Sequence, residues 1–226
     1  MSAGLGEAVY LCGEITDSRR ELWANVTYLL GCPVYVRDGA TLVLEPGTMI
    51  AAVPKDPSHP DVPVLVVERG GRIIADCSAE RPCTFTAANP GETESNEQVQ
   101  TDSSSSATVV YGARGKWGGV VLAGRAPTAL AEEPRVEGLD GVYYGGGDPD
   151  DSSGVLRYVR VWHAGAVISE DNEINGLTLA GVGRGTVVSH VEVAYSLDDG
   201  FEFFGGTVDV DHLSVLYIGD DAFDFD

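Results

Sequence analysis

DDGFEFF, the stretch at residues 198–204, returns as DDAFDFD at residues 220–226. The offset is 22 residues, and self-similarity at such a period is typical of a stacked repeat architecture. Three short segments also occupy equivalent places in successive units: Val159–Val161, Val191–Val193 and Leu213–Val215. Strands stacked in register from coils of about 20–30 residues form a parallel β-helix. The repeat therefore predicts an all-β fold, a single-stranded parallel β-helix or solenoid.

The rest of the chain fits an all-β fold. Short runs rich in Val, Leu, Ile and Tyr recur between turns rich in Gly, Asp and Pro, as is typical of strands. No amphipathic stretch is long enough for more than a turn or two of helix. Two segments break the pattern and are expected to be loop excursions, at residues 89–108 and 125–154. We therefore expect one β-helix domain over residues 1–226.

Stacking places equivalent side chains above one another, because adjacent strands lie about 4.8 Å apart. The valines and leucines of the three aligned segments are expected to face inward. Phe201 is expected to stack on Phe223 inside the coil. The same offset places His190 beside His212 in successive rungs. With the nearby carboxylate of Glu192 these imidazoles are an alternative zinc set, although ladder geometry alone also explains their spacing.

The composition limits the partners of the chain. Its 35 acidic and 14 basic residues give a formal net charge of −21. Nucleic acids and anionic membranes are poor partners for such a chain, because neutralising phosphates needs Lys and Arg. No run of about 18 apolar residues is present, so the sequence predicts no membrane span. Residues 1–7 lack the charged and apolar regions of a signal peptide, which suits a mature exported form or an intracellular protein.

The four cysteines favour the exported form, because disulfides persist in oxidising compartments. Four cysteines allow three connectivities, and we favour Cys12 with Cys32 and Cys77 with Cys83. The absence of a Cys-x-x-Cys motif weakens a zinc-site interpretation of these cysteines. Asn25 opens an Asn-Val-Thr sequon, which is a glycosylation site only in a eukaryotic secretory context.

Longer motifs run through the chain: GKWGGV at 115–120, VEG at 136–138, YYGGGD at 143–148, SGVLRYVR at 153–160, NEINGLTL at 172–179 and GVGRGT at 181–186. With the acidic repeat, they make the chain resemble a family of secreted, right-handed parallel β-helix proteins that are common on bacterial surfaces and mostly lack an assigned function. The resemblance covers nearly the whole chain, and it implies a right-handed coil and an extracellular or cell-surface location. Family members continue past the DDxFD rung, so we expect that the last rung is truncated here or covered by another subunit.

The repeated aspartates are the candidate metal site. Asp198, Asp199, Asp220, Asp221 and Asp224 are expected to stack, and two charges about 4.8 Å apart repel by roughly 3–4 kcal/mol at an effective dielectric near 20. Such carboxylates need water, hydrogen bonds or a cation. Calcium accepts carboxylate, carbonyl and water oxygens with flexible geometry, so calcium is the candidate cofactor. The alternative is that these aspartates bond backbone amides in turns and face solvent.

The long loop after residue 125 is the second candidate site, for ligand binding. Tyr143 and Tyr144 would offer aromatic faces to a glycan or a surface protein. Asp148, Asp150 and Asp151 would offer carboxylates. Long loops without secondary structure of their own are often functional.

We favour a structural, adhesive or glycan-binding surface module, stabilised by calcium, over an enzyme. A first alternative is a polysaccharide lyase or glycoside hydrolase, which rests on analogy with other parallel β-helices. Its candidate catalytic residues are Asp198, Asp199, Glu202 and Arg160. Convergence of Asp199, Glu202 and a basic side chain, with shifted acidities, would favour an enzyme. A second alternative is a filament-forming subunit that self-associates through its C-terminal end.

Overall fold

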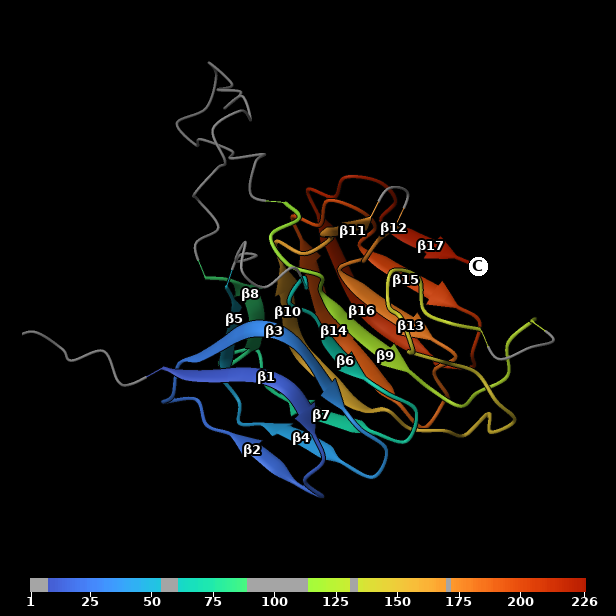
Figure 1. Cartoon of the computed structure of the whole chain (residues 1–226), viewed down its shortest axis with the longest axis horizontal. Coiled ribbons are helices and arrows are strands. Elements are labelled where there is room, and N and C mark those ends of the chain that lie inside the picture. Colours follow the sequence, from blue (N-terminus) through green and yellow to red (C-terminus); the bar gives the residue numbers. More distant parts are fainter. Residues whose placement is uncertain (1–7, 54–60, 89–113, 131–133, 170–171) are drawn as a thin grey trace, which may run out of the picture.

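The structure, a computed structural model, describes residues 8–53, 61–88, 114–130, 134–169 and 172–226. The predicted excursion at 89–108 lies outside these residues. The described residues form strands and no helix (Figure 1). The strands are β1 (Val9–Ile15), β2 (Arg20–Leu22), β3 (Tyr28–Val36), β4 (Thr41–Leu44), β5 (Met49–Ala52), β6 (Leu65–Val67), β7 (Arg72–Asp76), β8 (Cys83–Ala87), β9 (Val120–Ala123), β10 (Gly154–Trp162), β11 (Val167–Ser169), β12 (Asn172–Glu173), β13 (Leu177–Ala180), β14 (Val187–Ala194), β15 (Phe201–Phe204), β16 (Val210–Leu216) and β17 (Phe223–Phe225).

Apart from β11 and β12, which pair antiparallel with each other, the strands stack in three columns of parallel neighbours. The first column runs β3, β6, β9, β13, β15 and β17. The second runs β2, β4, β7 and then the first halves of β10, β14 and β16. The third runs from the first half of β3 through β5 and β8 to the second halves of β10, β14 and β16. The chain visits the columns in turn, so the fold is the predicted right-handed parallel β-helix.

The long strands β10, β14 and β16 serve two columns because each bends at one residue with positive φ. These residues are Tyr158 (φ 50°), His190 (φ 55°) and His212 (φ 52°), and we call them the corner ladder. The left-handed conformation is uncommon for residues other than glycine, and here it turns the strand around a corner of the coil. The rings stack from rung to rung, with centroids 4.4 Å apart for Tyr158 and His190 and 4.1 Å apart for His190 and His212.

The main core fills the coil, as the alignment of rungs predicts. Val159 and Val191 are each 1% exposed, and Leu213 of the next rung packs against the same cluster. The stacking of Phe201 on Phe223 is confirmed, since their ring centroids lie 5.5 Å apart. The expected burial of Phe223 is wrong, because this ring, on the last rung, is 43% exposed. Apolar side chains recur at the same place in each rung because every rung must fill the same cross-section of the coil.

A second apolar cluster lies outside the coil, on the outer face of the first column. Outward side chains of β6, β9 and β13 pack there against the loop that follows residue 134. That loop contributes Val136, Leu139, Val142 and Tyr144. Residues 134–144 of the excursion expected at 125–154 therefore pack over this face.

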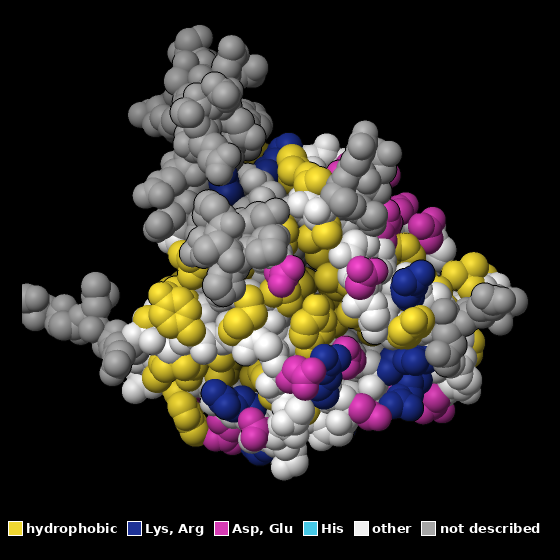
Figure 2. Space-filling model, viewed as in Figure 1, with side chains coloured by type: hydrophobic (Ala, Val, Ile, Leu, Met, Phe, Trp, Pro, Cys, Tyr) yellow, Lys and Arg dark blue, Asp and Glu magenta, His cyan; other side chains and the backbone are white. Residues whose placement is uncertain are grey.

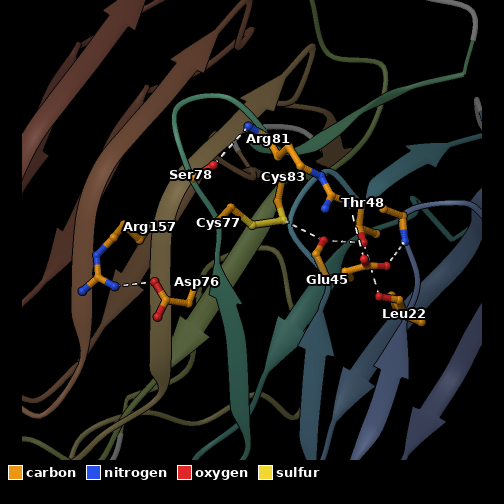
Figure 3. Close-up of a disulfide and its surroundings, with 10 residues drawn as sticks. Leu22, Glu45, Thr48, Asp76, Cys77, Ser78, Arg81, Cys83 and Arg157 are labelled. Atoms are coloured by element: carbon orange, nitrogen blue, oxygen red, sulfur yellow. Dashed lines mark hydrogen bonds and ion pairs between the residues drawn. A yellow bond between two sulfur atoms is a disulfide. The ribbon is translucent and has the colours of Figure 1, made fainter.

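Both disulfides form as expected, and no described cysteine is free. Cys12 and Cys32 join β1 to β3. Cys77 and Cys83 close the turn between β7 and β8 (Figure 3). Glu45 of the preceding rung lies beside this bridge and forms an ion pair of 3.4 Å with Arg81. The described residues contain no helix that is long and apolar enough to cross a membrane.

Phe201, which stacks on Phe223, and Phe225, which stacks on Phe203, test a buried and an exposed member of the two aromatic ladders. Phe201 is fully buried, whereas Phe225 is 71% exposed. We expect Phe201→Ala to lower the free energy of unfolding by about 3–5 kcal/mol, because it leaves a cavity in the coil. Phe225→Ala should cost less than about 1 kcal/mol. Urea unfolding followed by circular dichroism measures both, and equal losses would contradict the assignment of these positions.

Candidate functional site

Five carboxylates gather at the C-terminal end of the first column, and we call Asp198, Asp199, Glu202, Asp220 and Asp224 the carboxylate cluster. Their position follows from the register of β15 and β17, which pairs Glu202 with Asp224. The phenylalanines on either side of Glu202 face the coil, so Glu202 faces away from it. Because side chains alternate between the two faces of a strand, the phenylalanines of β15 face the core and its acidic side chain faces outward.

The cluster consists of two overlapping groups whose carboxylate oxygens lie within 4.8 Å of one another. Asp198, Asp199 and Asp220 form one group, and Asp199, Glu202 and Asp224 form the other. Asp199 belongs to both, so it links the two groups. Four of the five predicted metal ligands are therefore brought together, and Glu202 joins them from the predicted catalytic set.

Burial and mutual repulsion hold protons on these carboxylates. Burial raises the pKa of Glu202 to about 8, and the neighbouring Asp199 charge adds to the effect. Burial likewise raises the pKa of Asp198 to about 6, again with a contribution from Asp199. The pKa of Asp199 is raised by burial and partly lowered by its hydrogen bond to the Asp221 backbone. Among the described residues, the largest influences on the pKa of these three acids come from burial and other acidic groups, with no lysine or arginine among them.

Asn175 holds the two most buried carboxylates in place. Its side-chain nitrogen donates a hydrogen bond to Glu202, and its oxygen accepts one from the Asp199 backbone N–H at 3.2 Å. The backbone N–H of Asp221 donates to Asp199 Oδ1 at 2.9 Å. Asp221, expected as a metal ligand, thus contributes its N–H here, and its carboxylate lies in neither oxygen group.

Two further acids were missed by the sequence analysis. Glu137, from the covering loop, raises the pKa of both Asp198 and Glu202. Glu173, from β12, raises the pKa of Asp198. Both stand inside the motifs of the family resemblance, which was the only sequence signal for them.

The residues of the cluster suit a hard cation. Calcium binds carboxylate oxygens with variable geometry, and a divalent ion would replace the protons that the cluster otherwise retains. Glu202 and Asp199 are only 6% and 8% exposed, so few water molecules reach them to relieve the repulsion. Either protons or a cation must therefore compensate the charge of the cluster.

The ligand-binding residues predicted in the loop do not share one surface. Tyr144 is 4% exposed and packs in the second apolar cluster, so its expected presentation to a glycan is wrong. Tyr143 is 42% exposed. Asp148 accepts a hydrogen bond from the Asp150 backbone N–H at 3.1 Å, which is a turn-capping role.

The other two aspartates of this loop, Asp150 and Asp151, are an ion-pair partner and a partly buried side chain. Asp150 pairs with Arg184 at 3.4 Å, and Oδ2 of Asp151 is buried beside Gly124 without a hydrogen-bond partner. A side chain at position 124 would collide with that oxygen at 2.7 Å. The close approach of these two segments of the chain explains the glycine at position 124.

Arg160, the basic member of the predicted catalytic set, lies in the third column. It forms a loose ion pair of 4.0 Å with Glu192, as the stacking predicts, and its guanidinium lies 5.4 Å from the centre of the Trp162 ring. Both residues of the pair are partly exposed, so the pair contributes little to stability. Arg160 lines a groove of about 430 Å³ beside the corner ladder, not the carboxylate cluster.

Other arginines also have acidic partners outside the cluster. Arg125 pairs with Asp38 at 3.0 Å, and Arg157 pairs with Asp76. Blue and magenta side chains accordingly lie against one another over the face shown in Figure 2. Asn25 is exposed in a turn, where a glycan would be accessible, and its glycosylation stays a prediction.

The parallel coil and the loop packed over its first column define a parallel β-helix protein. A family model described as a pectate-lyase like beta helix domain matches residues 13–226, and the chain belongs to this family. No curated protein and no solved structure matches the chain. The family fixes the fold and fits a surface or carbohydrate-related role.

Glu202 makes the stability of the protein depend on pH. Its pKa in the folded state, about 8, lies above the ordinary value of 4.5, so the folded state retains a proton that the unfolded state releases. The contribution of this proton to the free energy of unfolding is therefore fully present below about pH 4.5. It is lost as the pH rises through about 8, and the loss is on the order of 3 kcal/mol. Urea unfolding in chelator across this range measures the loss.

Glu202→Gln keeps the acceptor for Asn175 and removes the titration. We expect this variant to flatten the fall in stability and to be more stable than the parent at pH 8. Asp209→Asn, at an exposed position in the segment between β15 and β16, should leave the pH profile unchanged. A Glu202→Gln variant with the parent's full pH dependence would contradict the assignment.

Proposed function

We propose that this chain is an extracellular β-helix module with a structural, adhesive or glycan-binding role, and that calcium bound by the carboxylate cluster stabilises its C-terminal rungs. The observation that carries the proposal is the convergence of Asp198, Asp199, Glu202, Asp220 and Asp224, whose oxygens lie within 4.8 Å of one another in two groups that share Asp199. The raised pKa values of Asp198 and Glu202 support the proposal, because they indicate that the negative charge of the neighbouring carboxylates is not compensated by a cation.

Calcium fits better than smaller or softer ions. It takes about six to eight oxygen ligands in flexible geometry, whereas magnesium demands a near-ideal octahedron and retains its waters. The cluster offers oxygens only, from two successive rungs whose spacing is set by the sheet. Extracellular modules bind calcium at about 10⁻⁴–10⁻³ M, and a site assembled from short aspartates and shared oxygens suits that range.

The wider role rests on the fold and the surface. Two disulfides support an extracellular location, since such bonds persist in oxidising compartments. Membership of a pectate-lyase like family supports a carbohydrate-related role. Of the two tyrosines expected to meet a glycan, Tyr143 is the accessible one, and aromatic faces pack well against apolar sugar faces.

Thermal unfolding with and without calcium tests the metal site. We expect calcium at a hundredfold excess over its dissociation constant to raise the melting temperature of chelator-stripped protein by about 5–10 °C, because it binds only the folded state. Asp199→Asn combined with Asp224→Asn should abolish the rise. Asp209→Asn is the matched control and should keep it. No rise in the parent, or an equal rise in the double variant, would refute the calcium site.

A glycoside hydrolase is the second candidate, because the cluster pairs two carboxylates of different acidity. Glu202, with a pKa of about 8, is protonated at neutral pH and could act as general acid. Asp199, with oxygens within 4.8 Å of those of Glu202, would act as nucleophile, since retaining enzymes place such groups about 5–5.5 Å apart. A lyase is less well supported, since it needs a base, and Arg160 lies beside Glu192 instead.

Release of reducing ends from neutral and acidic polysaccharides, with calcium present, separates the two functions. For a hydrolase, Glu202→Gln should lower turnover by more than about 100-fold, because it removes the general acid. Asp209→Asn should retain full turnover. A parent protein that binds these polysaccharides without cleaving any of them would favour the adhesive module and exclude the hydrolase on those substrates.

A further inference from the structure

A second polar cluster lies at the corner between the second and third columns, away from the carboxylate cluster. His190 and His212 stack there with ring centroids 4.1 Å apart and planes 8° apart. Ser189 and Asp211, which directly precede them, are paired in the register of β14 and β16. The positive φ of each histidine fixes its Cα–Cβ direction, so the two rings project from the corner side by side.

The hydrogen bonds of this cluster determine where each imidazole carries its proton. The Ser189 hydroxyl donates to Asp211 Oδ1 at 2.5 Å, so its single hydrogen is used. His190 Nδ1 lies 2.9 Å from the same hydroxyl and must therefore donate to it. His212 Nδ1 contacts Asp211, whose carboxylate accepts only, so this nitrogen also donates.

Both neutral rings thus carry hydrogen on Nδ1 and a lone pair on Nε2. Among the described residues, neither Nε2 atom has a hydrogen-bond partner. Metal-binding histidines typically show this arrangement, in which one ring nitrogen donates to a carboxylate and the other binds the ion. Imidazole nitrogen favours zinc, copper and nickel over calcium.

We propose that His190 and His212 bind one divalent ion of zinc, nickel or copper through their Nε2 atoms. Ser189 and Asp211 are positioning residues that hold the tautomers, and water completes the coordination. One ring nitrogen of each histidine and one carboxylate oxygen of Asp211 lie within 4.8 Å of one another, so the two rings are close enough to share an ion. The His212 side chain is 67% exposed, so its ring is free to tilt toward a shared ion.

The surroundings of the two rings accommodate a cation. Both histidines line the groove of about 430 Å³ that also contains Glu192 and Arg160. The Arg160 charge is opposed by Glu192 at 4.0 Å. The net charge of −21 raises the local concentration of cations around the whole chain. This site uses nitrogen ligands and does not depend on the proposed calcium site.

Calorimetric titration of the full chain with nickel or zinc chloride tests the proposal, at pH 7.5 with excess calcium to occupy carboxylates. We expect one ion per chain. His190→Gln with His212→Gln should weaken binding at least about 100-fold, and Asp211→Asn about 10-fold, because the latter removes only the orienting acceptor. His212→Gln alone, at an exposed position, guards against misfolding of the double variant and should also weaken binding. His59→Gln, at a histidine outside the described residues, is the control and should bind as the parent does.

Copper provides a readout that identifies the ligand atoms. The electron paramagnetic resonance spectrum of the copper-loaded parent should show coupling to imidazole nitrogen, and that of the double variant should not. Unchanged nickel affinity in the double variant, displacement of nickel by calcium, or loss of binding in His59→Gln would each overturn the proposal.

Discussion

The spacing between rungs governs both the stability and the chemistry of this protein. Each side chain lies about 4.8 Å from its equivalent in the next rung. For Phe201 and Phe223 this contact is favourable, and their rings stack at 5.5 Å. For Glu202 and Asp224, paired in the same strands, the same spacing brings like charges together and costs roughly 3–4 kcal/mol at an effective dielectric near 20. The aromatic ladder and the carboxylate cluster are thus opposite sides of one pair of strands.

Because the carboxylate cluster is buried, this repulsion makes the folded state bind protons or a cation. A loop packed on the first column brings Glu137 close to the cluster and limits water around it. Exposed aspartates would relax into solvent, but Glu202 and Asp199 are held by Asn175 and the backbone. The folded state therefore binds protons or a cation, and its stability is linked to whichever is available.

The sequence was sufficient to predict the repeating part of the fold. The offset between DDGFEFF and DDAFDFD gave the register of β15 and β17, and alternation along each strand gave the inward residues. The disulfides were predictable because their partners bracket short segments. The turns at Tyr158, His190 and His212 were not, because a left-handed corner is imposed by neighbouring rungs and not by local residue preference. The burial of Tyr144 was missed for a similar reason, since it depends on distant strands.

The candidate site was predictable only where it lies within the repeat. Asp198, Asp199, Asp220 and Asp224 stack because the repeat stacks. Asn175 and Glu173 reach the cluster from an earlier turn of the coil, and nothing in their spacing to the repeat indicates this.

Proton release on calcium binding tests the central claim most directly, namely that stacked, buried carboxylates must be neutralised by protons or by a cation. Calorimetry at pH 7 in buffers of different ionisation enthalpy measures it. Because Glu202 has a pKa of about 8 without metal, we expect about one proton to leave for each calcium ion bound, and fewer in Glu202→Gln. Calcium binding without proton release, or no calcium binding at all, would contradict the claim.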